Sequence, residues 1–120
     1  MPVEHINAAA AIRDFIDANP LSKKTPSELA ATFHVDRNKV LPVFKELTGY
    51  TIRGYQLQKL MEAASNMLLS GMMVKEVSIE CGYLHYPTNF TRSFRKVFKM
   101  GPNEWLHKKF LEKGGNNANE

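Results

Sequence analysis

The chain has 120 residues, of which 43% are hydrophobic and 23% charged, as is typical of a folded globular domain. Its formal net charge of +4 is compatible with a polyanionic partner but does not require one. Cys81 is the only cysteine, which excludes an internal disulfide. The chain has no CxxC or HExxH motif, no long apolar run and no signal-peptide pattern. We therefore expect no metal, no cofactor, no membrane association and a cytoplasmic location.

The first half of the chain has a helical period. Residues 7–18 form an amphipathic helix that Asn19-Pro20 ends. The sequence TPSE at 25–28 predicts a capped helix start with a capping box, and Asp36 predicts the N-cap of the next helix. Gly49 ends that helix. Two short helices separated by a turn indicate a helix-turn-helix, although a helical hairpin used only for packing fits this half equally well.

The same arrangement returns in the second half. A longer helix capped by Thr51 runs to about residue 69, and a short helix follows at 74–80 with Val77 and Ile79 inward. A second short-helix, turn, longer-helix unit makes an internal repeat of about 50 residues. We therefore predict an all-α fold with two helix-turn-helix subdomains joined by a long linker helix, about seven helices in total. The predicted boundaries are 7–50 for the first unit, 51–70 for the linker, 71–112 for the second unit and 113–120 for a disordered tail.

The second longer helix has two different faces. Its apolar residues fall within roughly 100° of helical arc: Phe90, Phe94, Val97 and Phe98. Polar and basic residues occupy the opposite arc: Thr88, Thr91, Arg92, Arg95 and Lys99. An ordinary solvated helix mixes charges of both signs, but this stretch contains no acid. Cations beside Thr and Asn suit a DNA groove, where they bind phosphates and base edges, so we favour a DNA-binding face.

A family resemblance rests on two stretches, SELAATFHVDRNKVLPVFKELTGYT and VKEVSIECGYLHYPTNFTRSFRKVFKMGPNEW. They resemble the DNA-binding domain of the AraC/XylS family of bacterial transcription activators, over about residues 10–110. The second stretch is similar to the family signature eIA…GF…yF.r.FK…G..P..yR. The resemblance implies two helix-turn-helix units whose recognition helices, about 37–46 and 87–98, enter successive major-groove segments of DNA.

The resemblance also implies which residues contact DNA. In the first recognition helix they are Arg37, Asn38, Lys39 and Lys45. In the second they are Thr88, Asn89, Arg92, Arg95, Lys96 and Lys99. Arg92 and Arg95 are the best candidates in the second unit, one for a base edge and one for a phosphate, with Lys96 and Lys99 as further phosphate contacts. Trp105 is expected to anchor the core.

The chain departs from the family pattern at several positions. Pro42 lies in the first recognition helix, where a polar or basic residue is common, and it removes a backbone hydrogen bond and is expected to bend the helix. Leu60 stands where an arginine is common, and Lys99 stands where a glycine is usual. The stretch from Tyr83 to Phe90 is one residue longer than the usual spacing.

We predict sequence-specific binding of double-stranded DNA and regulation of transcription, by a chain that is not an enzyme and acts as a monomer. RNA polymerase is a further candidate partner. An alternative stays open, in which the same fold binds DNA without sequence preference or contacts another protein. The family usually carries this domain at the end of a longer chain, so the sequence is either a stand-alone regulator or one domain of a longer protein.

Overall fold

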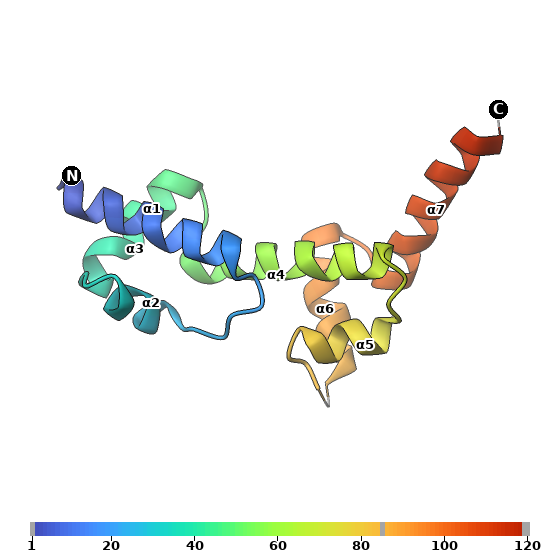
Figure 1. Ribbon diagram of the computed structural model, residues 1–120, viewed down its shortest axis with the longest axis horizontal. Helices are drawn as coiled ribbons and strands as arrows, with labels where there is room; N and C mark the ends of the chain where they lie inside the picture. The colour runs from blue at the N-terminus through green and yellow to red at the C-terminus, as the bar shows by residue number, and fades with distance from the viewer. Residues whose placement is uncertain (1, 85, 119–120) are drawn as a thin grey trace. The chain divides into compact units, whose positions relative to one another are not determined.

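The computed structural model describes residues 2–84 and 86–118, with side chains described as far as Lys113. These ranges contain helices and no strand, which confirms the predicted all-α class (Figure 1). The helices are α1 (Val3–Ala18), α2 (Pro26–Thr32), α3 (Arg37–Thr48), α4 (Ile52–Leu69), α5 (Val74–Glu80), α6 (Pro87–Phe98) and α7 (Pro102–Ala118). Within the described residues, none of these helices has the length and apolar character needed to span a membrane.

The chain divides into two compact units, and the division falls between Leu60 and Met61, in the middle of α4. Residues 52–60 therefore belong to the first unit and residues 61–69 to the second. The predicted linker helix is thus shared between two cores. Each unit contains a short helix followed by a longer one, α2 with α3 and α5 with α6, as the repeat predicts.

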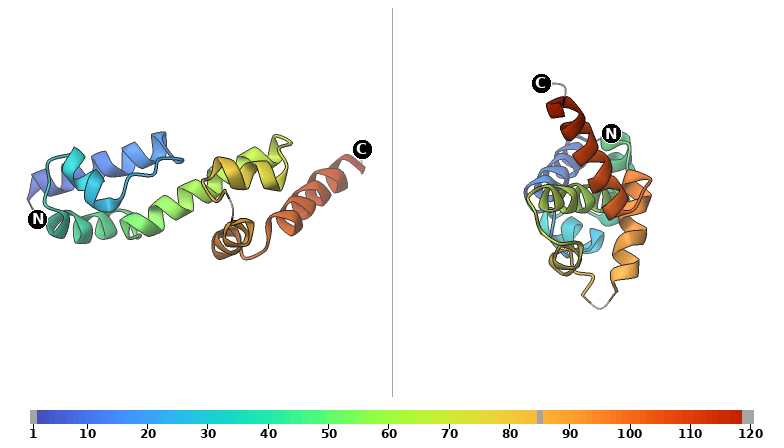
Figure 2. Two further views of the ribbon diagram at one scale, coloured as in Figure 1. Left: turned by 90° about the horizontal axis from the view of Figure 1, so that it is seen from below. Right: turned by 90° about the vertical axis from the view of Figure 1, so that its right-hand side faces the viewer.

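The core of the first unit is built around α3, which packs against α1 and α2 (Figure 1 and Figure 2). Phe44 is fully buried, and its ring meets that of Tyr55 edge to face with 5.5 Å between centroids. Ile12 and Leu29 are also fully buried in this cluster. Each such side chain contributes roughly 1.5–3 kcal/mol by leaving water. This packing fixes which face of α3 is left exposed.

A polar contact joins α1 to the start of α4 within the first unit. The Tyr55 hydroxyl donates a hydrogen bond of 2.5 Å to the carboxylate of Asp17. The ammonium of Lys59, one helical turn further along α4, lies 3.8 Å from the same carboxylate oxygen. Because Tyr55 also touches Phe44, one side chain connects the apolar core to this polar contact.

The core of the second unit contains a series of aromatic rings. Phe90 and Phe94 on α6 are fully buried, and the ring of Phe94 meets that of Trp105 edge to face at 5.7 Å. The ring centroids of Phe98 and Trp105 are 5.3 Å apart, and those of Tyr83 and Phe90 are 5.5 Å apart. Trp105 is only 7% exposed, which confirms its predicted role as a core anchor. The aromatic stripe read from the sequence is therefore the buried side of α6.

Three details differ from the sequence-based expectation. Ile79 was predicted inward but is 43% exposed, because two residues of α-helix turn it about 200° away from the buried Val77. α1 begins at Val3, four residues before the predicted start, since nothing in VEHIN breaks a helix. α7 continues to Ala118 although a disordered tail was predicted from residue 113, and residues 119–120 lie outside the described residues.

Candidate nucleic-acid interface

The exposed faces of α3 and α6 can be compared position by position. Both helices have twelve residues, and each ends at a residue in the left-handed region, Gly49 with φ 82° and Lys99 with φ 65°. Phe44 of α3 and Phe94 of α6 are both buried, and each contacts an aromatic residue of the next helix. Equivalent positions are therefore 50 apart, and Pro42 of α3 corresponds to Arg92 of α6.

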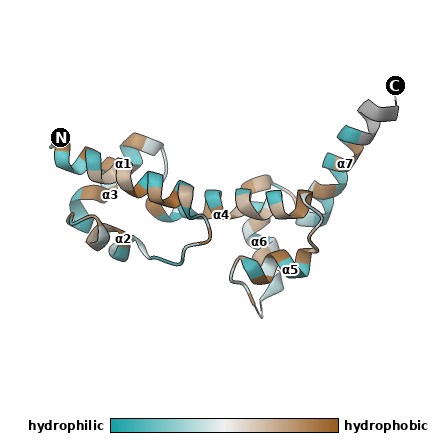
Figure 3. Cartoon of the chain, viewed as in Figure 1, coloured by the Kyte–Doolittle hydropathy of each residue, from teal (hydrophilic) through white to brown (hydrophobic). Residues whose placement is uncertain are grey.

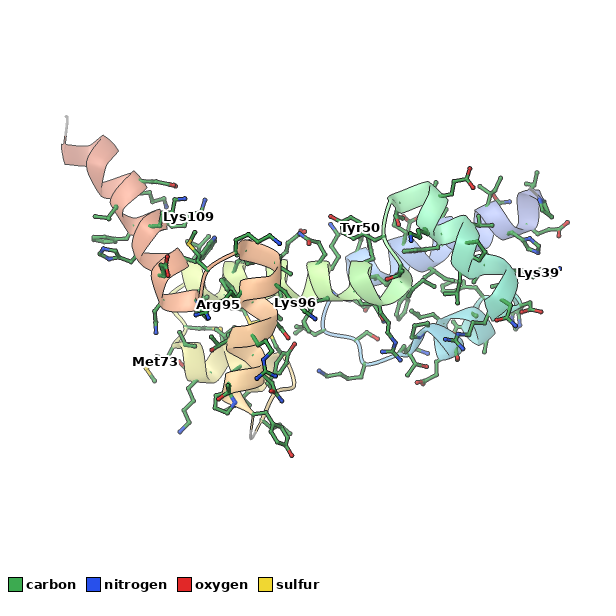
Figure 4. The ribbon with its side chains drawn as sticks, turned by 180° about the vertical axis from the view of Figure 1, so that it is seen from behind. Lys39, Tyr50, Met73, Arg95, Lys96 and Lys109 are labelled. Carbon is green, nitrogen blue, oxygen red and sulfur yellow. The ribbon has the colours of Figure 1, made fainter. Side chains whose placement is uncertain are left out.

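The structure places every predicted contact of the second unit on one exposed surface. Thr88, Asn89, Arg92, Arg95 and Lys96 lie on α6 and Lys99 caps it, and all six side chains are exposed. Figure 4 shows Arg95 and Lys96 on this helix. Among the described residues, no carboxylate pairs with any of the four cations. Their charge is therefore available to an anionic partner.

Local contacts orient three of these cations. The guanidinium of Arg92 donates a long hydrogen bond of 3.4 Å to the side-chain oxygen of Asn89. Arg95 lies over Gly101, where an added Cβ would be 3.5 Å from the guanidinium nitrogen. The ammonium of Lys99 donates to the carbonyl of Lys96 at the end of the helix. Arg92 thus sits in the middle of the exposed face, while Arg95 and Lys99 lie near its end.

The predicted contacts of the first unit also share one helix. Arg37, Asn38, Lys39 and Lys45 are all exposed on α3, and Figure 4 shows Lys39 near its beginning. This face is more mixed than that of α6, since it also carries Glu46 and the exposed Pro42. Coloured by hydropathy, the helices of both units alternate between apolar and polar residues (Figure 3). α3 remains a single helix with Pro42 inside it, and the predicted bend stays a prediction.

Sequence reasoning missed Arg53, an exposed cation at the start of α4. Its side chain lines a pocket of about 400 Å³ together with Arg37 and Lys45 of α3. The Thr51 hydroxyl caps this helix by accepting a hydrogen bond of 3.0 Å from the N–H of Gly54. The missed signal was a cation two residues after the predicted N-cap Thr51, in the first turn of the helix, since a helix start attracts phosphate.

A helix-turn-helix domain model matches residues 29–108 of the chain. The chain is 30% identical over 107 residues to the uncharacterized HTH-type transcriptional regulator YijO of Escherichia coli K12, covering 86% of this chain and 38% of that protein. It is 26% identical over 95 residues to the lactose operon transcription activator of Staphylococcus xylosus, covering 78% of this chain and 34% of that protein. The chain thus spans little more than a third of the length of these relatives.

Two solved structures share the fold. The DNA-binding domain of AdpA, a global transcriptional factor solved in complex with a target DNA, superposes with a TM-score of 0.74 at 20% identity, covering 88% of this chain and 94% of that one. A DNA-binding transcriptional dual regulator from Escherichia coli K-12 gives a TM-score of 0.70 at 20% identity, covering 84% of this chain and 90% of that one. The family match confirms the predicted resemblance: the chain belongs to the AraC-type helix-turn-helix family of DNA-binding domains.

Proposed function

We propose that this chain binds double-stranded DNA in a sequence-specific manner and thereby regulates transcription, with α3 and α6 as its recognition helices. The observation that carries the proposal is the exposed face of α6, where four cations and two polar side chains lie together without an acid. Cations gathered on one face repel one another, and an anionic partner bound to that face would relieve this repulsion. The aromatic residues opposite hold this face in a fixed orientation.

Within α6 we assign base reading to Arg92 and phosphate binding to Arg95. Arg92 projects from the middle of the exposed face beside Asn89, as a side chain directed at a groove floor would. A guanidinium there can bind the O6 and N7 atoms of guanine in a bidentate manner. Arg95 lies over Gly101 towards the end of the helix, a position that suits a contact with the DNA backbone. Lys96 and Lys99 are assigned to phosphates.

In the first unit we assign Arg37, Lys39 and Lys45 to phosphates, with Arg53 as an additional contact beside the shared pocket. Asn38 is the polar candidate for a base edge on α3. Its backbone N–H is already used, since it donates to the carboxylate of Asp36, so only the side chain is available. Base reading by this unit therefore depends on few hydrogen-bonding groups.

We further propose that the chain acts on the bacterial nucleoid in the cytoplasm, as a monomer and without catalysis. RNA polymerase is a candidate second partner. The support is that the chain has a helix-turn-helix domain, and that the two similar structures are a DNA-binding transcriptional regulator and the DNA-binding domain of a global transcriptional factor.

A second candidate function is DNA binding without sequence preference. Pro42 and Glu46 favour it, because they replace groove-reading and phosphate-binding groups on the exposed face of α3. In that case affinity would fall with rising salt equally on every sequence, since phosphate contacts would supply all of it.

The test is selection of bound sequences from random duplex DNA, followed by titration of the selected duplex and a scrambled one at the same salt concentration. We expect a preference of roughly 10³-fold or more for the selected duplex. Two conserved boxes in the selected sequences would indicate that both units read bases. No enriched sequence, with binding that only weakens as salt rises, would establish the non-specific alternative.

A further inference from the structure

α3 carries an apolar centre at the point where α6 carries a cation. Pro42 corresponds to Arg92, and Leu41 corresponds to Thr91. At 100° per residue, Pro42 lies roughly 150° away from the centre of the buried face formed by Val40, Val43 and Phe44. The proline is exposed and lies between Asn38 and Lys45 on the outward row. A groove that received α3 would therefore meet a proline ring near the middle of the contact.

The proline lines the pocket that was described beside α3. Its apolar lining comes from Leu41, Pro42 and Ile52, with Pro26 at the start of α2. Three cations, Arg37, Lys45 and Arg53, also line it, together with Thr51. All three cations are exposed. The pocket therefore joins an apolar surface to a cluster of positive charge, which suits an apolar group that is carried by a polyanion.

Duplex DNA offers one such group in its major groove. The C5-methyl of thymine is the only apolar group among the donors and acceptors that base pairs display there. A proline ring can neither donate nor accept a hydrogen bond, so it cannot select a base by a polar contact. It can only favour a base by apolar contact. The cations around it would bind the phosphates on either side.

We infer that Pro42, together with Leu41, reads a thymine methyl group, so that the first unit selects thymine where the second unit selects guanine. The inference rests on the proposed DNA binding and adds the base class that each unit reads. Pro42, which departs from the family pattern, would then make an apolar contact with a base in place of the polar contact that a basic residue would make there.

The experiment uses the full chain and its selected duplex, with each thymine replaced in turn by deoxyuridine, which lacks only the C5-methyl. We expect one replacement to weaken binding roughly fourfold, the effect of burying one methyl group. The variant Pro42→Gln should lose this difference and bind the thymine and deoxyuridine duplexes equally. Replacing a proline inside a helix restores a backbone N–H, so this variant is expected to fold at least as well.

Arg92→Ala is the matched control, because it alters the equivalent position of the other unit. It should lower affinity for both duplexes and keep the fourfold methyl effect. If no deoxyuridine duplex binds more weakly than the thymine duplex, the inference is overturned while the proposed function stands. A methyl effect that persists in Pro42→Gln would assign it to another residue and also overturn the inference. Failure to select any duplex would overturn the proposed function, and this inference with it.

Discussion

α3 and α6 have the same length, the same buried phenylalanine position and the same left-handed end, yet their exposed faces differ. Phe44 packs on Tyr55 in one unit and Phe94 on Trp105 in the other, with nearly equal ring separations of 5.5 and 5.7 Å. Outside, one helix presents four cations and the other a proline and an acid among its cations. Packing restricts the inner positions, whereas the outer positions are free to specialise.

The two units also differ in how their helices begin. Thr25 and Glu28 form a complete capping box at the start of α2, with hydrogen bonds of 3.1 and 3.2 Å. At the equivalent start of α5, Met73 offers no side-chain cap, and only its N–H donates to Glu76 at 2.9 Å. α6 likewise begins at Tyr86 without a side-chain cap. The helices of the second unit therefore depend more on their aromatic core.

Truncation of the central phenylalanines should produce the largest effects. Phe94→Ala should lower the free energy of unfolding by about 3–5 kcal/mol, because it removes a fully buried ring that contacts Trp105. Trp105 is the only tryptophan, so its fluorescence during urea denaturation reports the second unit alone. Phe44→Ala should lower the free energy of unfolding by a similar amount, as measured by circular dichroism, which reports both units. An unchanged fluorescence transition in Phe94→Ala would contradict the described core.

The next largest effect is expected from removing the guanidinium of Arg92, at the position equivalent to Pro42. Arg92→Ala should cost roughly 1–3 kcal/mol of binding free energy and relax the preference at one base pair. The measurement is the Kd for the selected duplex and for duplexes changed at single positions. Lys96→Ala is the comparison, since loss of a phosphate contact weakens binding to all sequences alike. Equal losses for Arg92→Ala on every duplex would argue against base reading.

The smallest expected effect compares the two helix starts. Thr25→Ala should lower the free energy of unfolding by about 1 kcal/mol, because the N–H of Glu28 loses its acceptor. Met73→Ala should change it little, since the Met73 side chain makes no cap and is 64% exposed. Urea denaturation followed by circular dichroism measures both. Similar losses in the two variants would mean that capping does not distinguish the units.

Much of the fold could be predicted because its signals are local. Caps at Thr25 and Asp36, the stop at Gly49 and the two-faced pattern of 87–98 each depend on residues within a few positions of one another. Ile79 was misplaced because the prediction put it on the same face as Val77, although two residues of α-helix separate their directions by about 200°. The family model and the shared fold bear out the overall class.

The candidate site was harder to predict in full. The residues of α6 follow one another on a single helix, so their common face can be read from spacing alone. Arg53 and the pocket beside Pro42 combine the starts of α2 and α4 with the middle of α3. Residues that are distant in sequence become neighbours only through tertiary packing, and no periodic pattern records that proximity.

Lys99 has a consequence for how this sequence would respond to selection. It holds a left-handed backbone at φ 65°, where the equivalent position in the first unit is a glycine. A side chain in this region costs roughly 1–2 kcal/mol relative to glycine. A library selected only for heat resistance should therefore drift towards glycine at this position. A library selected for retention on DNA should keep the lysine. Selection for stability and selection for DNA binding would therefore favour different residues at this position.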